Sequence, residues 1–482
     1  MLVTFVALYL VVTVAIGLWA AKRVHNAKDY VVAGRSVPLF MSMALVFATW
    51  FGAETVLGVS ATFLNDGLGG IVADPFGFSF CLVIIALFFA RAFYRLNLLT
   101  IGDFYRHRYN KPVEIATSIC ITLSYLGWVA AQLTALGLVF HTLSGGSISL
   151  GWGIALGTGI VLLYTIFGGM WSVAYNDVLQ SAIIIIGLIY LAFLLGGAAG
   201  GFDRVVAHAA EAGKFEFWPK LEAKEVLAFL AAFLTAALGS IPQQDVFQRV
   251  TAAKDADTAV RGTLLGAIIY FIMAFVPIYL AYCALIIDPK MVEPLLKGEN
   301  NESQHILPNL IAGHTPFFAQ VMFFGALLSA IMSSASAAML APSTLFTENV
   351  IRPFVPHMGD RQLLLVMRLV LVIFGLAVMA FALLSDASIY QMVQNAYKVT
   401  LVSAFAPLVL GLYWRRSTTD GALLSVVLGL STWVLMEVIA PEALVPPQLV
   451  GMGFSFLGMI VGSLYGRQTP PAHAAHPHHG GH

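Results

Sequence analysis

The segment SAIMSSASAAMLAPS, from Ser329 to Ser343, carries hydroxyl side chains at helical spacing inside an apolar run. Ser329, Ser333, Ser336 and Ser343 follow one another at i, i+4, i+7 and i+14, which places them on one face of a helix, with Ser334 beside them. Two interpretations fit this pattern. Small hydroxyl residues allow membrane helices to pack closely, and paired hydroxyls with freed backbone carbonyls suit a hard cation such as sodium.

A second segment, FATWFGAETVLG, places the acid Glu54 in the middle of an apolar stretch between Pro38 and Leu64. Gly52 lowers the cost of leaving helical geometry, although a glycine can also serve close helix contact. A charged carboxylate at the centre of a membrane helix costs about 2.5 to 3.5 kcal/mol. Glu54 therefore predicts a functional role; pairing with Lys398 and a protonated, hydrogen-bonded core acid are the structural alternatives.

A third segment, LGSIPQQDVFQR, contains Pro242, which removes a backbone donor and crowds the preceding turn. Gln243 follows the proline directly, so we expect it to face a cavity. Asp245 and Arg249, four residues apart, favour a polar cap where a helix ends at the cytoplasm. These three segments have the composition of interrupted membrane helices.

Two further segments supply polar groups at helical spacing. In QMVQNAYKVTLVSAFAPL, the basic residue Lys398 lies within an apolar stretch and follows several amide side chains. In YLGWVAAQLTALG, Trp128 and Gln132 share one helical face. Tryptophan in a membrane protein is usually interfacial, but the segment boundaries place Trp128 deeper than that.

The composition identifies the elements that must position these residues. Of 482 residues, 59% are hydrophobic and only 10% are charged, whereas soluble domains carry roughly 25% charged residues. The chain is therefore predicted to be an all-α, polytopic membrane protein of about thirteen transmembrane helices, each of about 20 residues. These run roughly over 2–21, 37–64, 70–92, 113–141, 150–168, 177–197, 225–242, 263–287, 316–347, 363–384, 389–414, 419–440 and 448–465.

Charge patterning predicts the orientation. The first segment has no basic residue before it and Lys22, Arg23 and Lys28 after it, so we expect a retained helix with its N-terminus outside. Most of the 25 Lys and Arg residues then fall in inner loops. We expect a multi-pass plasma-membrane protein, in a bacterial inner membrane, with a cytoplasmic C-terminus. The His- and Pro-rich tail 467–482 is predicted to be disordered, with weak metal binding as the alternative.

The motifs of several functions are absent from the sequence. The sequence contains neither G-x-x-x-x-G-K-[ST] nor H-E-x-x-H, so ATP hydrolysis and zinc proteolysis have no visible site. The sequence contains no repeated filter motif of the kind that predicts a channel. It also has no cluster of basic residues of the kind that predicts nucleic-acid binding. The three cysteines, Cys81, Cys120 and Cys283, do not indicate a metal cluster. We expect a secondary transporter driven by an ion gradient, with a small solute and the bilayer as its partners, no obligate protein partner and no cofactor beyond the coupling ion.

Several motifs resemble those of the sodium:solute symporters, which include the sodium/glucose, sodium/proline and choline transporters. They are AGRSVPLF, YTIFGGMWSVAYNDVLQ, SIPQQDVFQR, GALLSAIMSSASAAMLAPSTLF and GLYWRRSTTDGALLSVVLG. The resemblance implies a transmembrane domain over 1–466 with the LeuT-type fold. This consists of one extra N-terminal helix, five helices repeated in inverted topology over 37–197 and 225–414, and two extra C-terminal helices.

The resemblance also implies a sodium site. Its ligands would be the carbonyls of Ala48, Phe51 and Ala330 and the hydroxyls of Ser333 and Ser334. We expect the solute site to contain residues compared with the family motifs together with the polar groups identified above: Trp50, Glu54, Trp128, Gln132, Gln243, Ser336 and Lys398.

The solute can be narrowed by comparing these residues with the choline transporters. Trp50 and Trp128 stand where those proteins place cage tryptophans, but Gln243 stands where a further tryptophan would be, and Ser336 replaces an aspartate. Glu54 and Lys398 would suit the two ends of a zwitterion. We expect sodium-coupled symport of an amino acid such as proline, or of a related zwitterion or quaternary amine; the alternatives are proton coupling and a non-transporting sensor on the same scaffold.

Overall fold

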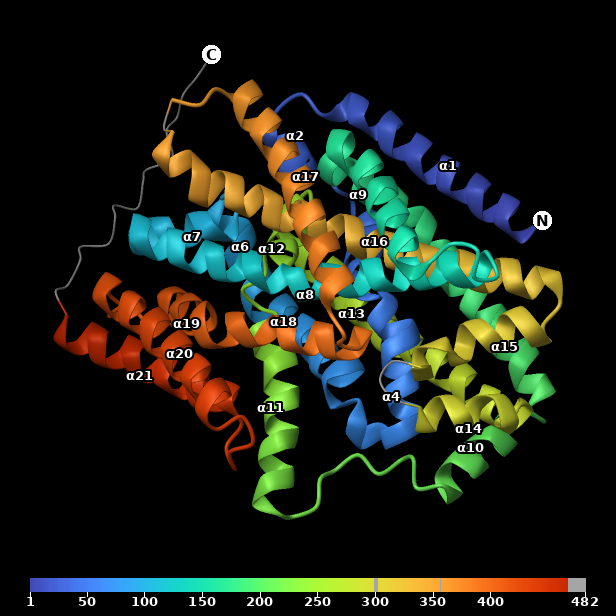
Figure 1. Cartoon of the computed structure of the whole chain (residues 1–482). Helices are drawn as coiled ribbons and strands as arrows, with labels where there is room; N and C mark the ends of the chain where they lie inside the picture. The colour runs from blue at the N-terminus through green and yellow to red at the C-terminus, as the bar shows by residue number, and fades with distance from the viewer. Residues whose placement is uncertain (299–301, 356, 467–482) are drawn as a thin grey trace.

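The computed structural model describes residues 1–298, 302–355 and 357–466, and these residues form a bundle of helices (Figure 1). No strand occurs within these ranges. The predicted disorder of the tail 467–482 concerns residues outside them.

Nine helical segments within the described ranges are long and apolar enough to cross a membrane. Eight of them are built on α1 (Leu2–Ala20), α8 (Lys111–Leu143), α9 (Leu150–Ala198), α13 (Ala256–Ile287), α16 (Phe317–Phe346), α17 (Asp360–Leu384), α20 (Thr419–Ile439) and α21 (Pro447–Tyr465). The ninth is composed of η5 (Val72–Gly77), α5 (Phe78–Ile84), η6 (Ile85–Phe89) and α6 (Ala90–Leu96).

Three bent pairs of helices raise the number of possible spans among the described residues to twelve. They are α3 (Leu39–Trp50) with η3 (Glu54–Gly58) and α4 (Val59–Asp66), bent by 53°; α11 (Ala223–Gly239) with α12 (Gln244–Ala252), bent by 45°; and α18 (Ile389–Ser403) with α19 (Phe405–Tyr413), bent by 48°. Shorter helices lie in the connections: α2 (Ala27–Val32), α7 (Ile101–Arg108), α10 (Phe202–Glu211), α14 (Pro289–Lys297) and α15 (Ile306–His314).

Two of the predicted interruptions are confirmed, and the third is not. The bends at Gly52 and beside Pro242 lie where the sequence predicts them. The serine-rich helix α16 is continuous, and the third bend lies at Ala404 instead. Pro407 explains that position, because it has no N–H to donate to the carbonyl of Ser403 four residues earlier.

Helix α9 contains two of the predicted spans, 150–168 and 177–197. Its 49 residues would extend about 74 Å, against about 30 Å for a hydrocarbon core. At Gly169 its backbone adopts φ 49° and ψ −136°, a conformation that is open to glycine and strained for other residues. The predicted total of about thirteen spans counts α9 twice, and that total stays a prediction.

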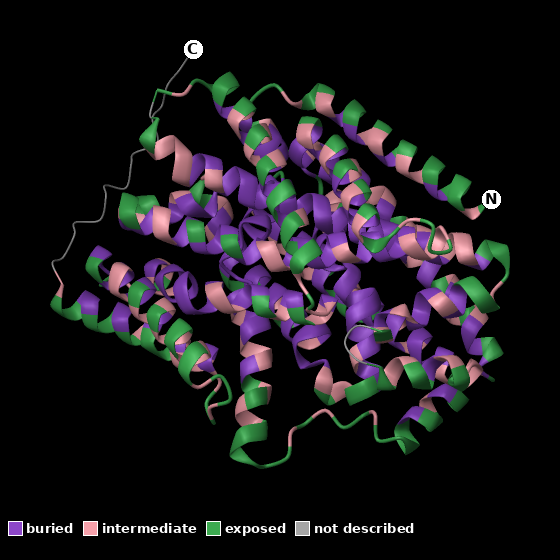
Figure 2. Cartoon of the chain, in the orientation of Figure 1, coloured by how far each residue is buried: buried purple, intermediate pink, exposed green. Residues whose placement is uncertain are grey.

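Buried residues concentrate at the centre of the bundle, where α3, α8, α16 and α12 meet (Figure 2). By contrast, α1, α17, α20 and α21 carry many exposed apolar residues, and Figure 2 shows α1, α20 and α21 at the edges of the bundle. A parallel bridge between Val37 and Ala253 ties the segment before α3 to the segment after α12. The two helices that begin the predicted repeats are therefore joined at one end.

We expect Gly169→Ala to lower the free energy of unfolding by about 1–3 kcal/mol, because the backbone conformation is strained for alanine. A Cβ at this position would also lie 2.5 Å from the carbonyl oxygen of Tyr30. Thermal unfolding of the purified protein in detergent measures the effect. Gly159→Ala in the same helix is the control, since a Cβ there meets nothing within 4 Å; equal losses for both variants would contradict the prediction.

Candidate functional site

The break in α3 leaves backbone groups without their helical partners. Gly52 N donates to Trp50 O at 3.2 Å rather than to Ala48 O. Ala53 N donates to the side-chain oxygen of Gln132 at 2.9 Å rather than to Thr49 O. The carbonyls of Ala48 and Thr49 are thereby freed for other donors.

Serine hydroxyls from α16 reach these freed carbonyls. Ser333 Oγ donates to Ala48 O at 2.7 Å and lies 3.1 Å from Ala330 O. Ser334 Oγ lies 2.9 Å from Thr49 O and 3.3 Å from Ala48 O. Four of the five predicted sodium ligands thus form one buried cluster of oxygen atoms. We call Ala48 O, Ala330 O, Ser333 Oγ and Ser334 Oγ the oxygen cluster.

Phe51, the fifth predicted ligand, is the first residue after α3 and has the non-helical angles φ −88° and ψ 80°. Within the described ranges, no group of three or more His, Cys, Asp or Glu side chains could hold a metal ion. The oxygen cluster is instead made of neutral hydroxyls and carbonyls. Such ligands suit a monovalent hard cation.

Gln132 bridges the break from α8. Its side-chain oxygen accepts from Ala53 N, and its Nε2 donates to Glu54 Oε2 at 2.5 Å. A Cβ on Gly52 would lie 2.5 Å from Glu54 Oε2, 2.8 Å from Ser334 Oγ and 2.9 Å from Gln132 Oε1. Oxygen atoms from three helices therefore converge on Gly52, which explains why this position holds a glycine.

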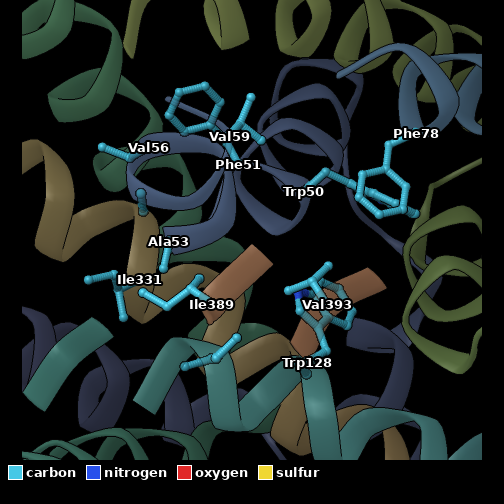
Figure 3. Packing of buried hydrophobic residues seen from close by; sticks show 14 of the residues in the cluster. Trp50, Phe51, Ala53, Val56, Val59, Phe78, Trp128, Ile331, Ile389 and Val393 are labelled. Carbon is cyan, nitrogen blue, oxygen red and sulfur yellow. The ribbon is translucent and has the colours of Figure 1, made fainter. Parts of the chain in front are cut away.

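Four aromatic rings close a circuit beside the break. Ring centroids are 5.2 Å apart for Trp50 and Phe78, 5.3 Å for Phe78 and Tyr397, 6.1 Å for Tyr397 and Trp128, and 6.2 Å for Trp128 and Trp50. Figure 3 shows Trp50 beside Phe78 with Trp128 nearby. The rings come from α3, α5, α18 and α8, and all four are buried. We call these four residues the aromatic box.

The structure places Gln243 and Ser336 in other contacts. Gln243 Nε2 donates to Ser124 Oγ at 3.1 Å and to Thr400 Oγ1 at 3.3 Å, so Gln243 joins the start of α12 to α8 and α18. Ser336 Oγ donates to Ser333 O at 3.1 Å within α16. Both side chains are buried.

The structure does not bring Lys398 to Glu54. Lys398 Nζ lies 3.4 Å from Glu437 Oε1, and Trp433 Nε1 donates to the same carboxylate oxygen at 3.1 Å. The Lys398 side chain is 23% exposed, whereas Glu54 is buried. The structural alternative in which Glu54 pairs with Lys398 is therefore wrong. Helix α18 turns Tyr397 inward and the next residue, Lys398, toward α20.

The predicted polar cap at the cytoplasmic end of the span 225–242 is also wrong. Asp245 and Arg249 are buried. Arg249 donates through Nε to Thr49 Oγ1 at 2.6 Å and through Nη1 to Asp245 O at 2.8 Å. Asp245 in turn accepts a hydrogen bond from Tyr125. Arg249 therefore holds α12 against the last turn of α3, and Asp245 holds it against α8.

Sequence reasoning missed four buried acids: Asp74, Glu114, Asp177 and Glu348. Neither carboxylate oxygen of Asp177 on α9 has a hydrogen-bond partner. Asp74 in η5 accepts from Thr55 Oγ1 at 3.1 Å and from the Tyr270 hydroxyl. Asp177 is the first residue of the predicted span 177–197, and Asp74 is the fifth residue of the predicted span 70–92. The cost of an acid at the centre of a membrane helix, which singled out Glu54, therefore did not select them.

Comparison with known proteins decides the family. The model of the sodium:solute symporter family matches residues 30–429. The chain belongs to the sodium:solute symporter family. This protein is therefore a multi-pass membrane transporter that couples sodium to the movement of a small solute, and it is not an enzyme.

Curated relatives of this symporter include choline and sugar transporters. The high-affinity choline transporter 1 of Torpedo marmorata is 29% identical over 442 residues, covering 89% of this chain and 75% of the relative. The human high affinity choline transporter 1 is 28% identical over 456 residues, again covering 89% of this chain and 75% of the relative. The sodium/glucose cotransporter of Vibrio parahaemolyticus is 25% identical over 449 residues, covering 87% of this chain and 82% of the relative.

Solved structures support the fold of this symporter. A Na⁺-coupled sialic acid symporter, in a substrate-bound outward-open state, matches with a TM-score of 0.83 and 19% identity, covering 97% of this chain and 99% of that one. Mhp1, a nucleobase-cation-symport-1 family transporter, matches with a TM-score of 0.61 and 14% identity, covering 89% and 93%. The predicted LeuT-type fold is confirmed, whereas the repeat boundaries 37–197 and 225–414 stay predictions.

We expect Gln132→Ala to destabilise the symporter by about 1–3 kcal/mol, because Ala53 N and Glu54 Oε2 would lose their buried partner. Thr134→Val is the matched control, since the Thr134 hydroxyl on the same helix has no hydrogen-bond partner to lose. Thermal unfolding in detergent measures both variants. If the two variants have the same melting temperature, Gln132 does not stabilise the break.

Proposed function

We propose that this symporter couples sodium to the uptake of a small solute that carries an ammonium group. The observation that carries the proposal is the aromatic box beside Glu54, with Lys398 paired elsewhere. Aromatic faces attract cations by about 0.5–2 kcal/mol per ring, and a buried carboxylate adds an opposite charge. An ammonium solute would satisfy both groups.

The proposed coupling ion binds at the oxygen cluster, with Phe51 O as a fifth ligand. Hydroxyl oxygens that now donate to the freed carbonyls would act as ligands once sodium is bound. Inward movement of one sodium ion releases about 2.3 kcal/mol per 100 mV of membrane potential. That free energy would drive solute accumulation by alternating access in the plasma membrane, with the N-terminus outside and the C-terminus in the cytoplasm; a bacterial inner membrane is the proposed location.

Sodium and the solute would both bind at the same break in α3, which supports coupled binding. Ala48 and Phe51 supply carbonyls on the sodium side, and Trp50 and Glu54 face the solute side. Ligands that stabilise one local geometry increase each other's affinity by the same factor. Gly52, packed against Ser334 Oγ and Glu54 Oε2, lies where the two sites meet.

Replacing both Ser333 and Ser334 by alanine should raise the sodium concentration at half-saturation by about tenfold or more, since two ligands would be lost. We would measure the sodium-dependent shift in melting temperature of the purified protein, with KCl keeping the ionic strength constant. Ser343→Ala is the control, because that hydroxyl bonds only Met339 O in its own helix. An unchanged midpoint, or stabilisation by a pH change without sodium, would favour proton coupling.

Ammonium compounds should stabilise the protein in sodium more than their neutral isosteres do. Choline against 3,3-dimethylbutan-1-ol is one such pair, and proline tests the zwitterion class. Glu54→Gln should weaken ammonium binding about three- to thirtyfold, because one opposite charge is removed. Glu437→Gln is the control, since that acid pairs with Lys398. A panel in which no ammonium compound exceeds its isostere would overturn the proposed solute class.

A further inference from the structure

Helix α1 lies outside the central bundle, along α9 and α16, and most of its side chains are exposed (Figures 1 and 2). The polar side chain of Tyr9 reaches inward from α1. The Tyr9 hydroxyl lies 2.8 Å from Ser329 Oγ on α16 and accepts from Gln180 Nε2 on α9 at 3.3 Å. Because the phenol oxygen accepts from Gln180, its proton can be donated to Ser329. Tyr9 therefore joins three helices.

The α16 turn that Tyr9 contacts also carries part of the oxygen cluster. Ser329 is adjacent to Ala330 and is one helical turn before Ser333. The carbonyl of Ala330 and the hydroxyl of Ser333 lie 3.1 Å apart on this turn. One turn of α16 thus carries both the contact with Tyr9 and two groups of the oxygen cluster.

We propose that Tyr9 is a positioning residue for sodium binding. Its hydroxyl holds the Ser329 turn of α16 against α9, so that Ala330 O and Ser333 Oγ remain aligned with Ala48 O. This inference rests on the sodium site proposed above. It assigns the extra N-terminal helix a role in ion binding, in addition to its contact with lipid.

The surroundings of Tyr9 make its hydroxyl hard to replace. Ser329 and Gln180 are both 0% exposed, and Gln180 Oε1 already lacks a hydrogen-bond partner. Without the phenol hydroxyl, Ser329 Oγ and Gln180 Nε2 would lose their partner in a region that water does not reach. Buried polar groups without partners drive a local shift toward other donors and acceptors, and such a shift would move the α16 turn.

Helix α1 offers a matched control in Thr13. This hydroxyl is also buried, but it donates to Tyr9 O at 3.0 Å, so its hydrogen bond stays within α1. Thr13→Val therefore removes a buried hydroxyl from the same helix and leaves the link to Ser329 intact.

The test is a sodium titration of the full-length protein in detergent, with sodium as the only ligand and KCl keeping the ionic strength constant. The midpoint of the sodium-dependent rise in melting temperature should increase about two- to tenfold in Tyr9→Phe, the range expected for one hydrogen bond. Ser329→Ala should cause a similar increase, and the double variant no further increase, because both changes remove one interaction. Thr13→Val should leave the midpoint unchanged.

The outcomes separate this inference from the sodium site itself. A general loss of packing would lower the melting temperature at every salt concentration without moving the midpoint, and would overturn the role of Tyr9. An equal shift in Thr13→Val would also overturn it. If Tyr9→Phe does not fold, Ser329→Ala carries the same test. If Ser333→Ala does not move the midpoint either, the proposed sodium site is wrong; if only Ser333→Ala moves it, the site stands and Tyr9 has no part in it.

Discussion

The break between Trp50 and Glu54 imposes the constraint on which the rest of the structure depends. Backbone groups in a membrane interior must find partners inside the protein, since no water is present to supply them. The break frees the carbonyls of Ala48 and Thr49 and the amide of Ala53. Side chains of α16 and α8 satisfy them, so both helices must lie against this one turn of chain.

The kinds of partner at the break explain how an ion can act there. A carbonyl that accepts a hydrogen bond within a helix is not available to a cation. A carbonyl that accepts from a serine hydroxyl is available, because the hydroxyl can rotate away and present its own oxygen to the cation as well. Ser333 and Ser334 stand in that relation to Ala48 and Thr49. On the other side of the break, Gln132 holds Glu54. Any change in the geometry of α3 is therefore felt by both sets of partners, which is the physical requirement for coupled transport.

Features that depend on local composition could be predicted from the sequence, whereas features that depend on helix rotation could not. The apolar segments, the bends at Gly52 and Pro242, and the serine face of α16 follow from residue type and spacing. The partner of Lys398 and the burial of Arg249 depend on which neighbour each helix face meets, and periodicity does not give that. The bend at Ala404 was predictable, since Pro407 has the same effect on the helix as Pro242.

The burial of acids near the break affects the free energy of closing the symporter around its solute. Glu54 is held by the neutral amide of Gln132, and Asp74, bonded by Thr55 next to Glu54, is held by neutral hydroxyls. Neutral donors replace only part of the hydration that a carboxylate loses on burial. An ammonium solute would supply the missing opposite charge, so closure would cost less with the solute bound than without it. Glu54, which would attract the solute, and its neighbour Asp74 would then disfavour a closed state without solute. The closed state would therefore form more readily with the solute bound.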